Sequence, residues 1–354
     1  MALFRQREKA VARAGIIAYT IMTVIWLWAV LSFREPAGDP WRYMLGLNYI
    51  AKFSFVELLS YDRTPFGFAL LNWITSLIST NSVFFFSVIY AFCIIPLYLA
   101  FRERANKTDA AVLMMLYLLY PFYINYLASG FKQGIAFGFM LWGLNCILDR
   151  ADPKWIKGLL LLFLATLFHS SFWLVNVVFA SWYFIYRRIS LQWSFFTLGI
   201  CIFIAAIGVS EFIITKILPG SIVEALGFSS YFDQEFLASD EYLSVGYKSG
   251  FRIDFAVFTI IPIFIISYLK KNIKENFYMI NMMKFYCIVA SVYFIFIFIP
   301  YSDRIAGFSW FLIPSLLYNQ FGFFDFKKYK EYLVVFIISS YPILMLVYTK
   351  GYFQ

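Results

Sequence analysis

Long apolar runs separated by short polar connections dominate this chain of 354 residues. Most of the runs approach the roughly 20 residues that an α-helix needs to cross the hydrocarbon core of a bilayer. The strands of an outer-membrane barrel would alternate apolar and polar residues instead. The pattern therefore predicts an all-α, polytopic membrane protein with about 10 to 12 transmembrane helices, forming a single transmembrane domain over 1–354. The runs fall at 14–33, 66–80, 82–101, 110–128, 131–148, 156–169, 170–186, 194–210, 252–269, 277–300, 304–321 and 332–349.

Composition narrows the class of protein further. Hydrophobic residues make up 62% of the chain and charged residues only 14%, whereas a soluble domain has about 25% charged residues. A soluble enzyme, a nucleic-acid-binding domain and a disordered chain are therefore excluded. The cysteines all lie inside apolar runs, which predicts small buried hydrophobes and neither disulfides nor a metal site. They are Cys93, Cys146, Cys201 and Cys287.

The net charge of +9 comes largely from basic clusters between the runs. Such clusters mark cytoplasmic connections, so we expect the longer, mixed-sign connections at 34–65 and 211–251 on the outer, periplasmic or extracellular face. The first run has no cleavage site after it and is predicted to be a retained helix. The basic connections are Arg102 to Lys107, Arg150 to Lys157, Arg187 with Arg188, Lys270 to Lys274, Lys327 to Lys330, and the amino-terminal Arg5 to Arg13.

Near the amino terminus, the number of predicted spans conflicts with the sidedness that the basic connections indicate. If 66–80 and 82–101 both cross, the amino terminus and the later basic connections fall on opposite sides. The run at 66–80 is short for a span, so we interpret it as re-entrant or interfacial, which leaves about 11 spans. Alternatively 41–60 crosses, although Arg42, Lys52 and Glu57 favour an amphipathic helix that lies on the membrane surface.

Candidate chemistry gathers at the ends of runs on the predicted outer face. Ionisable groups at membrane depth are costly and are functional hypotheses by default. Cations and the only histidine on one face outline a site for an anionic ligand. The alternatives are cations that snorkel to lipid headgroups and structural ion pairs within Arg252–Asp254 and Asp303–Arg304. The residues are Lys132, His169, Arg252, Asp254, Asp303 and Arg304.

A lipid pyrophosphate is the anion that suits this position, since its tail stays in the bilayer while its phosphates lie at the interface. The cations would stabilise the charge that develops on the leaving pyrophosphate during glycosyl transfer, and His169 could take the proton of the attacking hydroxyl. No paired carboxylates stand out for a divalent metal, so we expect metal-independent chemistry without a cofactor. Competing carboxylate candidates for the base are Asp39, Asp62, Asp233, Glu235, Asp240 and Glu241.

Five short motifs resemble those of the EpsG-like, Wzy-type polysaccharide polymerases. The run from Phe131 to Ala136 resembles the signature R-Q-G-(I/L)-A, and Leu164 to Ser171 resembles A-x-x-F-H-x-S. Lys132 replaces the signature's arginine, which keeps the charge but loses the two-pronged geometry. The stretch from Asp62 to Pro65 stands where the family commonly has a glutamate. The other three motifs are G-x-D-x-x-x-Y around Gly38 to Tyr43, G-x-R-x-D at Gly250 to Asp254, and S-D-R-I at Ser302 to Ile305.

The resemblance implies a membrane glycosyltransferase of the GT-C-like type in the bacterial cytoplasmic (inner) membrane, active on its periplasmic or extracellular face. Such an enzyme joins undecaprenyl-pyrophosphate-linked oligosaccharide donor and acceptor units into O-antigen, capsule or exopolysaccharide. Its implied partners are a flippase and a chain-length regulator. A flippase or transporter of lipid-linked oligosaccharides and an O-antigen ligase remain the alternatives. The implied catalytic residues are His169, Asp39 and Asp254, and the implied pyrophosphate- or substrate-binding residues are Lys132, Gln133, Arg252, Asp303 and Arg304.

Overall fold

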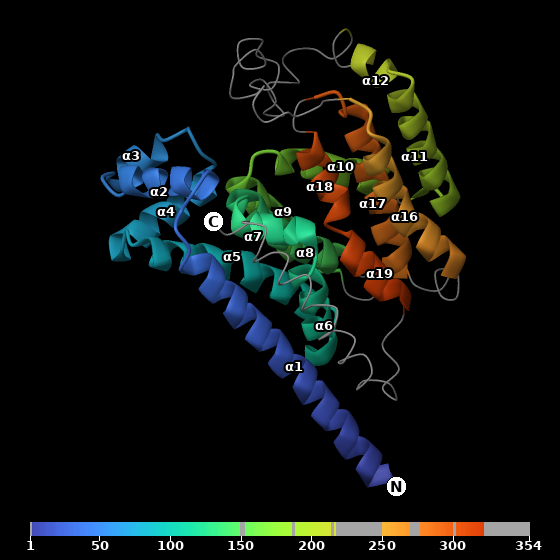
Figure 1. The fold of residues 1–354 in the computed structure, drawn as a ribbon. Helices are drawn as coiled ribbons and strands as arrows, with labels where there is room; N and C mark the ends of the chain where they lie inside the picture. The colour runs from blue at the N-terminus through green and yellow to red at the C-terminus, as the bar shows by residue number, and fades with distance from the viewer. Residues whose placement is uncertain are drawn as a thin grey trace. The chain divides into compact units, whose positions relative to one another are not determined.

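The computed structural model describes residues 2–148, 153–185, 188–213, 216, 250–269, 277–299 and 302–321. Every regular element in these residues is a helix, so the all-α prediction is confirmed (Figure 1). The helices form two compact units: Met1–Ile147 with Asp152–His169 make up the body of unit 1, and Ser170–Gln320 the body of unit 2. The single transmembrane domain over 1–354 stays a prediction.

Unit 1 runs from α1 to α9, and most of its helices coincide with predicted apolar runs. The alternative span at 41–60 is instead two short helices, α2 and α3, as its amphipathic pattern favours. The helices are α1 (Ala2–Ser32), α2 (Asp39–Ile50), α3 (Phe55–Leu59), α4 (Phe66–Ile78), α5 (Ser82–Arg102), α6 (Lys107–Leu118), α7 (Pro121–Ala128), α8 (Phe131–Ile147) and α9 (Trp155–Phe168).

Three described helices are long and apolar enough to cross a membrane, namely Ala10–Ser32, Ser82–Arg102 and Phe277–Ile295. The apolar run predicted at 110–128 consists of two helices, α6 and α7, which meet at a bend of 77° and together are apolar enough for one broken span or a re-entrant loop. Pro121 begins α7 and disfavours helical backbone in the residue before it. That residue, Tyr120, is extended. The total of about 11 spans stays a prediction, and the run at 332–349 lies outside the described residues.

Helix α4 falls on the run that we interpreted as re-entrant or interfacial. It has 13 residues and is therefore about 20 Å long. The hydrocarbon core of a bilayer is about 30 Å thick. A single α4 helix is too short to cross it unaided, which supports the interpretation.

Helix α8 is the interior helix of unit 1 and packs against α5 and α9. A Cβ at Gly138 would lie 3.1 Å from a backbone nitrogen of α5, and one at Gly143 would lie 2.8 Å from the carbonyl oxygen of Gly158 on α9. Small residues at such contacts allow the backbones of membrane helices to approach closely. The Asn145 amide also donates to a backbone carbonyl of α5 at 2.7 Å. These contacts fix α8 between its neighbours.

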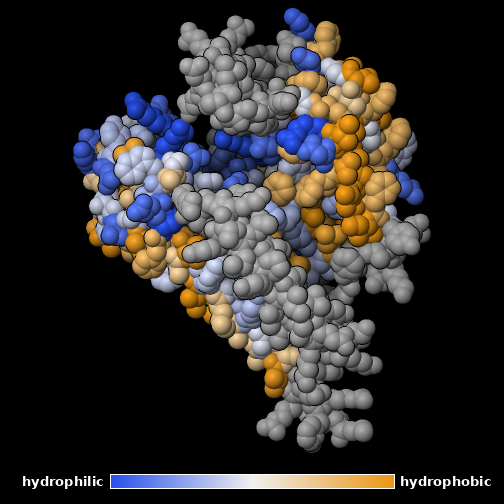
Figure 2. Space-filling view, in the orientation of Figure 1, coloured by the Kyte–Doolittle hydropathy of each residue, from blue (hydrophilic) through white to orange (hydrophobic). Residues whose placement is uncertain are grey.

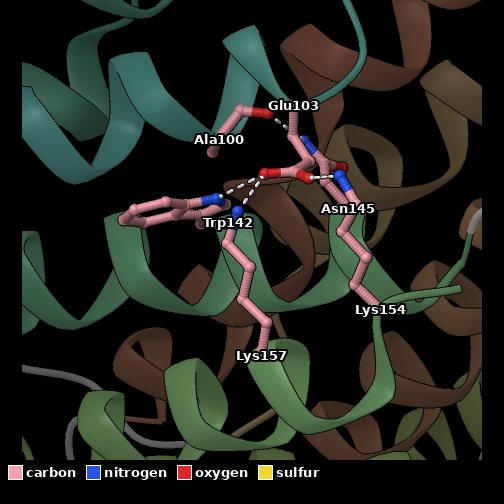
Figure 3. Close-up of polar contacts among 6 residues, drawn as sticks. All are labelled: Ala100, Glu103, Trp142, Asn145, Lys154 and Lys157. Carbon is pink, nitrogen blue, oxygen red and sulfur yellow. Dashed lines mark hydrogen bonds and ion pairs between the residues drawn. The ribbon is translucent and has the colours of Figure 1, made fainter.

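Glu103 links the carboxyl-terminal half of α8 to α9 (Figure 3). Its Oε2 accepts hydrogen bonds from Trp142 Nε1 at 2.9 Å and Lys157 Nζ at 2.6 Å, and its Oε1 accepts one from Lys154 Nζ at 2.8 Å. Burial by itself raises the pKa of Glu103. The hydrogen bonds from the two lysines and the indole outweigh burial and lower this pKa to about 2. The carboxylate is therefore ionised at any physiological pH.

We expect the Glu103→Gln variant to be less stable than the wild type by about 1–3 kcal/mol, because charge-assisted hydrogen bonds are lost. The folded-state pKa of Glu103 lies below its ordinary value, so its stabilisation is fully present above about pH 4.5 and is lost as the pH falls toward 2. Thermal unfolding in detergent should therefore show a difference in melting temperature between the wild type and Glu103→Gln, and this difference should become smaller below pH 4.5. Glu35→Gln, at an exposed position, is the control. A difference in melting temperature that does not depend on pH would contradict the prediction.

Unit 2 is built around α17, which is almost entirely buried. The Thr259 backbone carbonyl accepts a hydrogen bond from the Tyr286 hydroxyl at 2.7 Å, and the Thr259 hydroxyl accepts one from Trp310 Nε1 at 2.9 Å. Thr259 thus joins α16 to both α17 and α18. The described helices are α10 (Phe172–Phe184), α11 (Leu191–Ala206), α12 (Val209–Phe212), α16 (Ile253–Leu269), α17 (Phe277–Ile295), α18 (Asp303–Trp310) and α19 (Ile313–Phe321).

The predicted span at 304–321 is also two helices in the structure. Phe311 and Leu312 form a turn between α18 and α19, although Phe311 itself keeps right-handed helical dihedral angles. Pro314 is the second residue of α19, where proline is tolerated because the first turn needs no intrahelical N–H partner. The apolar run therefore contains a helix start that its hydropathy did not indicate.

An apolar stripe runs along the exposed side of helix α16. Ile253, Val257, Ile261 and Phe264 are each 47% exposed or more and recur at the spacing of one helix face. Figure 2 shows the corresponding orange surface over unit 2. Exposed apolar stripes of this kind are expected on helices that face lipid, since water would penalise them. The stripe supports the prediction of a membrane protein.

Candidate functional site

Lys132 lies in the first turn of α8, directly after the turn from α7. Its side chain is half-buried, and its Nζ lies 5.5 Å from the ring centre of Tyr43 on α2 and 5.3 Å from that of Phe68 on α4. A lysine ammonium over aromatic faces is attracted by the ring quadrupoles. Three separate elements thus position this cation.

Arg34, just after α1, is a second cation beside the same turn, and the sequence analysis missed it. Its guanidinium lies 5.5 Å from the ring centre of Phe86 and 5.9 Å from that of Phe131, and it donates a hydrogen bond to the Ala128 carbonyl. Burial lowers the pKa of Arg34 to about 10, so the side chain is still charged at neutral pH. In the sequence, the only indication of this residue's importance was that an arginine directly follows the first apolar run.

Arg34 and Lys132 flank one pair of aromatic rings. The Tyr43 and Phe131 rings have centres 5.2 Å apart; Lys132 lies over Tyr43, and Arg34 lies over Phe131. We call these four residues the cation–aromatic cluster. Two positive charges beside apolar rings are suited to an anion that carries a hydrophobic group.

Asp39 and Gln133 lie close to the cation–aromatic cluster in sequence but differ in exposure. Asp39 begins α2, is exposed and pairs with Arg42 at 3.5 Å. Exposed pairs of this kind contribute little to stability. Gln133 is 5% exposed and belongs to the packed face of α8. Of the competing carboxylates, Asp62 is exposed. The others, Asp233, Glu235, Asp240 and Glu241, lie outside the described residues.

His169 ends α9 and is half-buried. Its backbone is extended, and its N–H donates to the Ala165 carbonyl at 3.1 Å, which closes the helix. Leu167 packs so closely on α4 that a Cβ at Gly67 would lie 2.8 Å from the Leu167 carbonyl oxygen. The next residue of α4, Phe68, is the ring beneath Lys132. The first turn of α4 therefore contacts both the Lys132 side chain and the end of α9 that carries His169.

In unit 2 Arg252 and Asp254 form an ion pair at the start of α16. Arg252 donates through Nε at 3.1 Å and also through a terminal nitrogen to the two carboxylate oxygens. The guanidinium carbon lies 3.7 Å from the ring centre of Phe255. Both charged side chains are well exposed, at 42% and 61%. The structural ion pair between Arg252 and Asp254, which the sequence analysis gave as an alternative to a ligand site, is present.

Asp303 and Arg304 are the first two residues of α18, as their motif predicted. Asp303 is half-buried and Arg304 is exposed. The eight predicted residues thus divide between the units, with Asp39, Lys132, Gln133 and His169 in unit 1 and the other four in unit 2. Their convergence on one site stays a prediction. Within the described residues no three His, Cys, Asp or Glu side chains group as metal ligands, and metal independence also stays a prediction.

The family model described as "EpsG family" matches residues 16–353, which is nearly the whole chain. The chain belongs to the EpsG family. The predicted resemblance is therefore confirmed, and the EpsG family supports a role of the polysaccharide polymerase type with glycosyltransferase-like activity. No curated protein and no solved structure matches the chain significantly.

Proposed function

We propose that this EpsG-family protein joins lipid-pyrophosphate-linked oligosaccharide repeat units into a polysaccharide on the outer face of the bacterial cytoplasmic membrane. Membership of the family over 16–353 supports the polymerase role. The observation that carries the choice of donor is the cation–aromatic cluster. Arg34 and Lys132 offer two positive charges beside the Tyr43 and Phe131 rings. A pyrophosphate joined to a polyprenyl chain needs this combination of charge and apolar surface.

The proposed reaction is a glycosyl transfer. The bond between the anomeric carbon of the donor chain and the pyrophosphate oxygen breaks, and a bond from that carbon to a hydroxyl oxygen of the acceptor unit forms. The hydroxyl proton passes to a base, and the lipid pyrophosphate leaves with the bonding electron pair. Arg34 and Lys132 stabilise the charge that grows on this leaving group. No metal or other cofactor takes part in the proposed reaction.

His169 is the proposed base, with Asp39 and Asp254 as the carboxylate alternatives. An imidazole has an unperturbed pKa close to neutral pH and can accept a proton there. His169 ends α9 beside the same first turn of α4 that contacts Lys132. We assign Gln133, Arg252, Asp303 and Arg304 to substrate binding because they match the family motifs. The proposal includes about 11 spans, a GT-C-like fold, and a flippase and a chain-length regulator as partners.

Deletion of the gene in its host tests the proposed function. On a gel of surface polysaccharide, we expect the ladder of polymer lengths to disappear while single repeat units remain on their carrier. The wild-type gene on a plasmid should restore the ladder, and so should the Lys52→Ala variant, which changes an exposed lysine outside the cation–aromatic cluster. Loss of the single units as well would indicate a flippase and would contradict the proposal. Polymer built normally but left unattached to its final acceptor would indicate a ligase.

A further inference from the structure

A groove between α1, α5 and α6 of unit 1 opens at the surface of the protein. Its volume is about 270 Å³, and its walls are mostly aliphatic. Three isoleucines at its rim, Ile21 and Ile25 of α1 and Ile95 of α5, are 52%, 55% and 55% exposed. These residues belong to helices that are long and apolar enough to cross the membrane. The groove is therefore a recess in the lipid-facing surface.

Polar groups are few in the groove: among the described residues that line it, Thr20 of α1 and Tyr98 of α5 carry hydroxyls, and Lys107 of α6 carries a charge. Thr20 is the one hydroxyl along the α1 wall, and it lies 2.9 Å from the Ile16 carbonyl and 3.3 Å from the Ala111 carbonyl. Its hydrogen bonding is satisfied within the protein. A hydrocarbon chain is the ligand that such a recess accepts, because it buries apolar surface without leaving a polar group unpaired.

Hydrogen bonds join α1 to α5 on the side of the groove nearer the predicted outer face. There, Trp28 Nε1 donates to the Ser87 hydroxyl at 2.9 Å, and the Tyr90 hydroxyl donates to the Val24 carbonyl at 2.8 Å. These bonds hold α1 against α5 between the groove and Arg34. The groove is therefore distinct from the proposed donor site.

One basic side chain lines the groove on the side nearer the predicted cytoplasmic face. Lys107, the exposed first residue of α6, lines the groove there and belongs to a connection that we predict to be cytoplasmic. The nearby acids already have partners: Asp109 accepts from the Asn106 amide at 2.5 Å, and Glu103 binds two lysines of α9's first turn and cap. Lys107 is thus positioned to attract a phosphate, as basic pockets between helices on the cytoplasmic side do.

The length of the groove fits one leaflet. Along α1 it extends from Ile17 to Ile25, which corresponds to about 12 Å of helix. Half of a hydrocarbon core of about 30 Å is about 15 Å. We propose that the groove binds one acyl chain of an anionic phospholipid of the cytoplasmic leaflet, with the phosphate of that lipid on Lys107.

Native mass spectrometry of the full-length protein tests this proposal. Protein released from detergent micelles is titrated with phosphatidylglycerol, phosphatidylethanolamine or a polyprenyl phosphate. We expect the wild type to retain one phosphatidylglycerol in preference to phosphatidylethanolamine. A lysine near a phosphate contributes about fivefold in affinity, so Lys107→Glu should lower the occupancy of phosphatidylglycerol by at least about this factor.

Two tryptophan variants distinguish specific lipid binding in the groove from nonspecific contact of lipid with an apolar surface. Ile95→Trp fills the groove and should lower retention of the lipid. Ile200→Trp, at a position 41% exposed on α11, adds the same bulk to another apolar surface and should leave retention unchanged. Three outcomes would overturn the proposal: equal occupancy in Lys107→Glu, equal loss in both tryptophan variants, or preferential retention of polyprenyl phosphate over phosphatidylglycerol.

Discussion

Replacing Lys132 with methionine is expected to lower the rate of polymer formation about 10²–10³-fold, the usual effect of removing one preorganised charge-stabilising group from a reaction centre. Methionine keeps the unbranched stem that packs on the Tyr43 and Phe68 rings, so the fold around α8 should persist. In cells, the polysaccharide ladder should collapse to single repeat units. In membranes supplied with lipid-linked units, the initial rate measures the effect directly.

The matched variants are Lys132→Arg and Lys52→Ala. Arginine restores the positive charge and the geometry of the family signature, so we expect most of the activity to remain. Lys52 is exposed and lies outside the cation–aromatic cluster, and its loss should leave the rate unchanged. Wild-type chain lengths from Lys132→Met, at an equal amount of protein in the membrane, would remove Lys132 from the proposed site.

Replacing Gly143 with alanine is expected to destabilise the protein by about 1–3 kcal/mol. The added Cβ would lie 2.8 Å from the carbonyl oxygen of Gly158 and 3.0 Å from a side-chain carbon of Leu162. A backbone oxygen cannot move aside as a flexible side-chain end can, so α8 and α9 must separate. The apparent melting temperature in detergent, followed by size-exclusion chromatography of heated samples, measures the loss.

Gly199→Ala is the control, since Gly199 also lies within a helix of the described chain but has no atom within 4 Å of its added Cβ. There alanine should be neutral or stabilising by up to about 1 kcal/mol, because it has the better helix propensity. Equal melting temperatures for the two variants would show that the α8–α9 contact is not limiting for stability.

The helices that could be predicted from the sequence are those whose apolar run is uninterrupted. The runs at 82–101 and 131–148 end within about one residue of α5 and α8 because hydropathy changes sharply at both ends. The breaks at Tyr120 and Phe311 were missed for the opposite reason. Apolar residues continue across each break without a polar connection, and only a proline nearby distinguishes two helices from one.

Residues of the candidate site that belong to a short sequence motif could be predicted. Residues whose role depends on contacts with distant parts of the chain were missed. The Arg252–Asp254 pair lies within three residues and follows from the motif itself. The importance of Arg34 depends on Phe86, Ala128 and Phe131, which are far from it in sequence. Glu103 stood among basic residues, and nothing in the local pattern indicated that it would bind two lysines about 50 residues later.

The enclosed position of α8 affects how the sequence can drift during evolution. Its glycines meet α5 and α9, and most of its other side chains are buried, so almost every change there disturbs a packed neighbour. The stripe on α16 is exposed among the described residues, and in contact with lipid any apolar residue of similar size would serve as well. Distant members of the family should therefore resemble one another along α8, where the motif beginning at Phe131 lies, long after α16 has diverged beyond recognition.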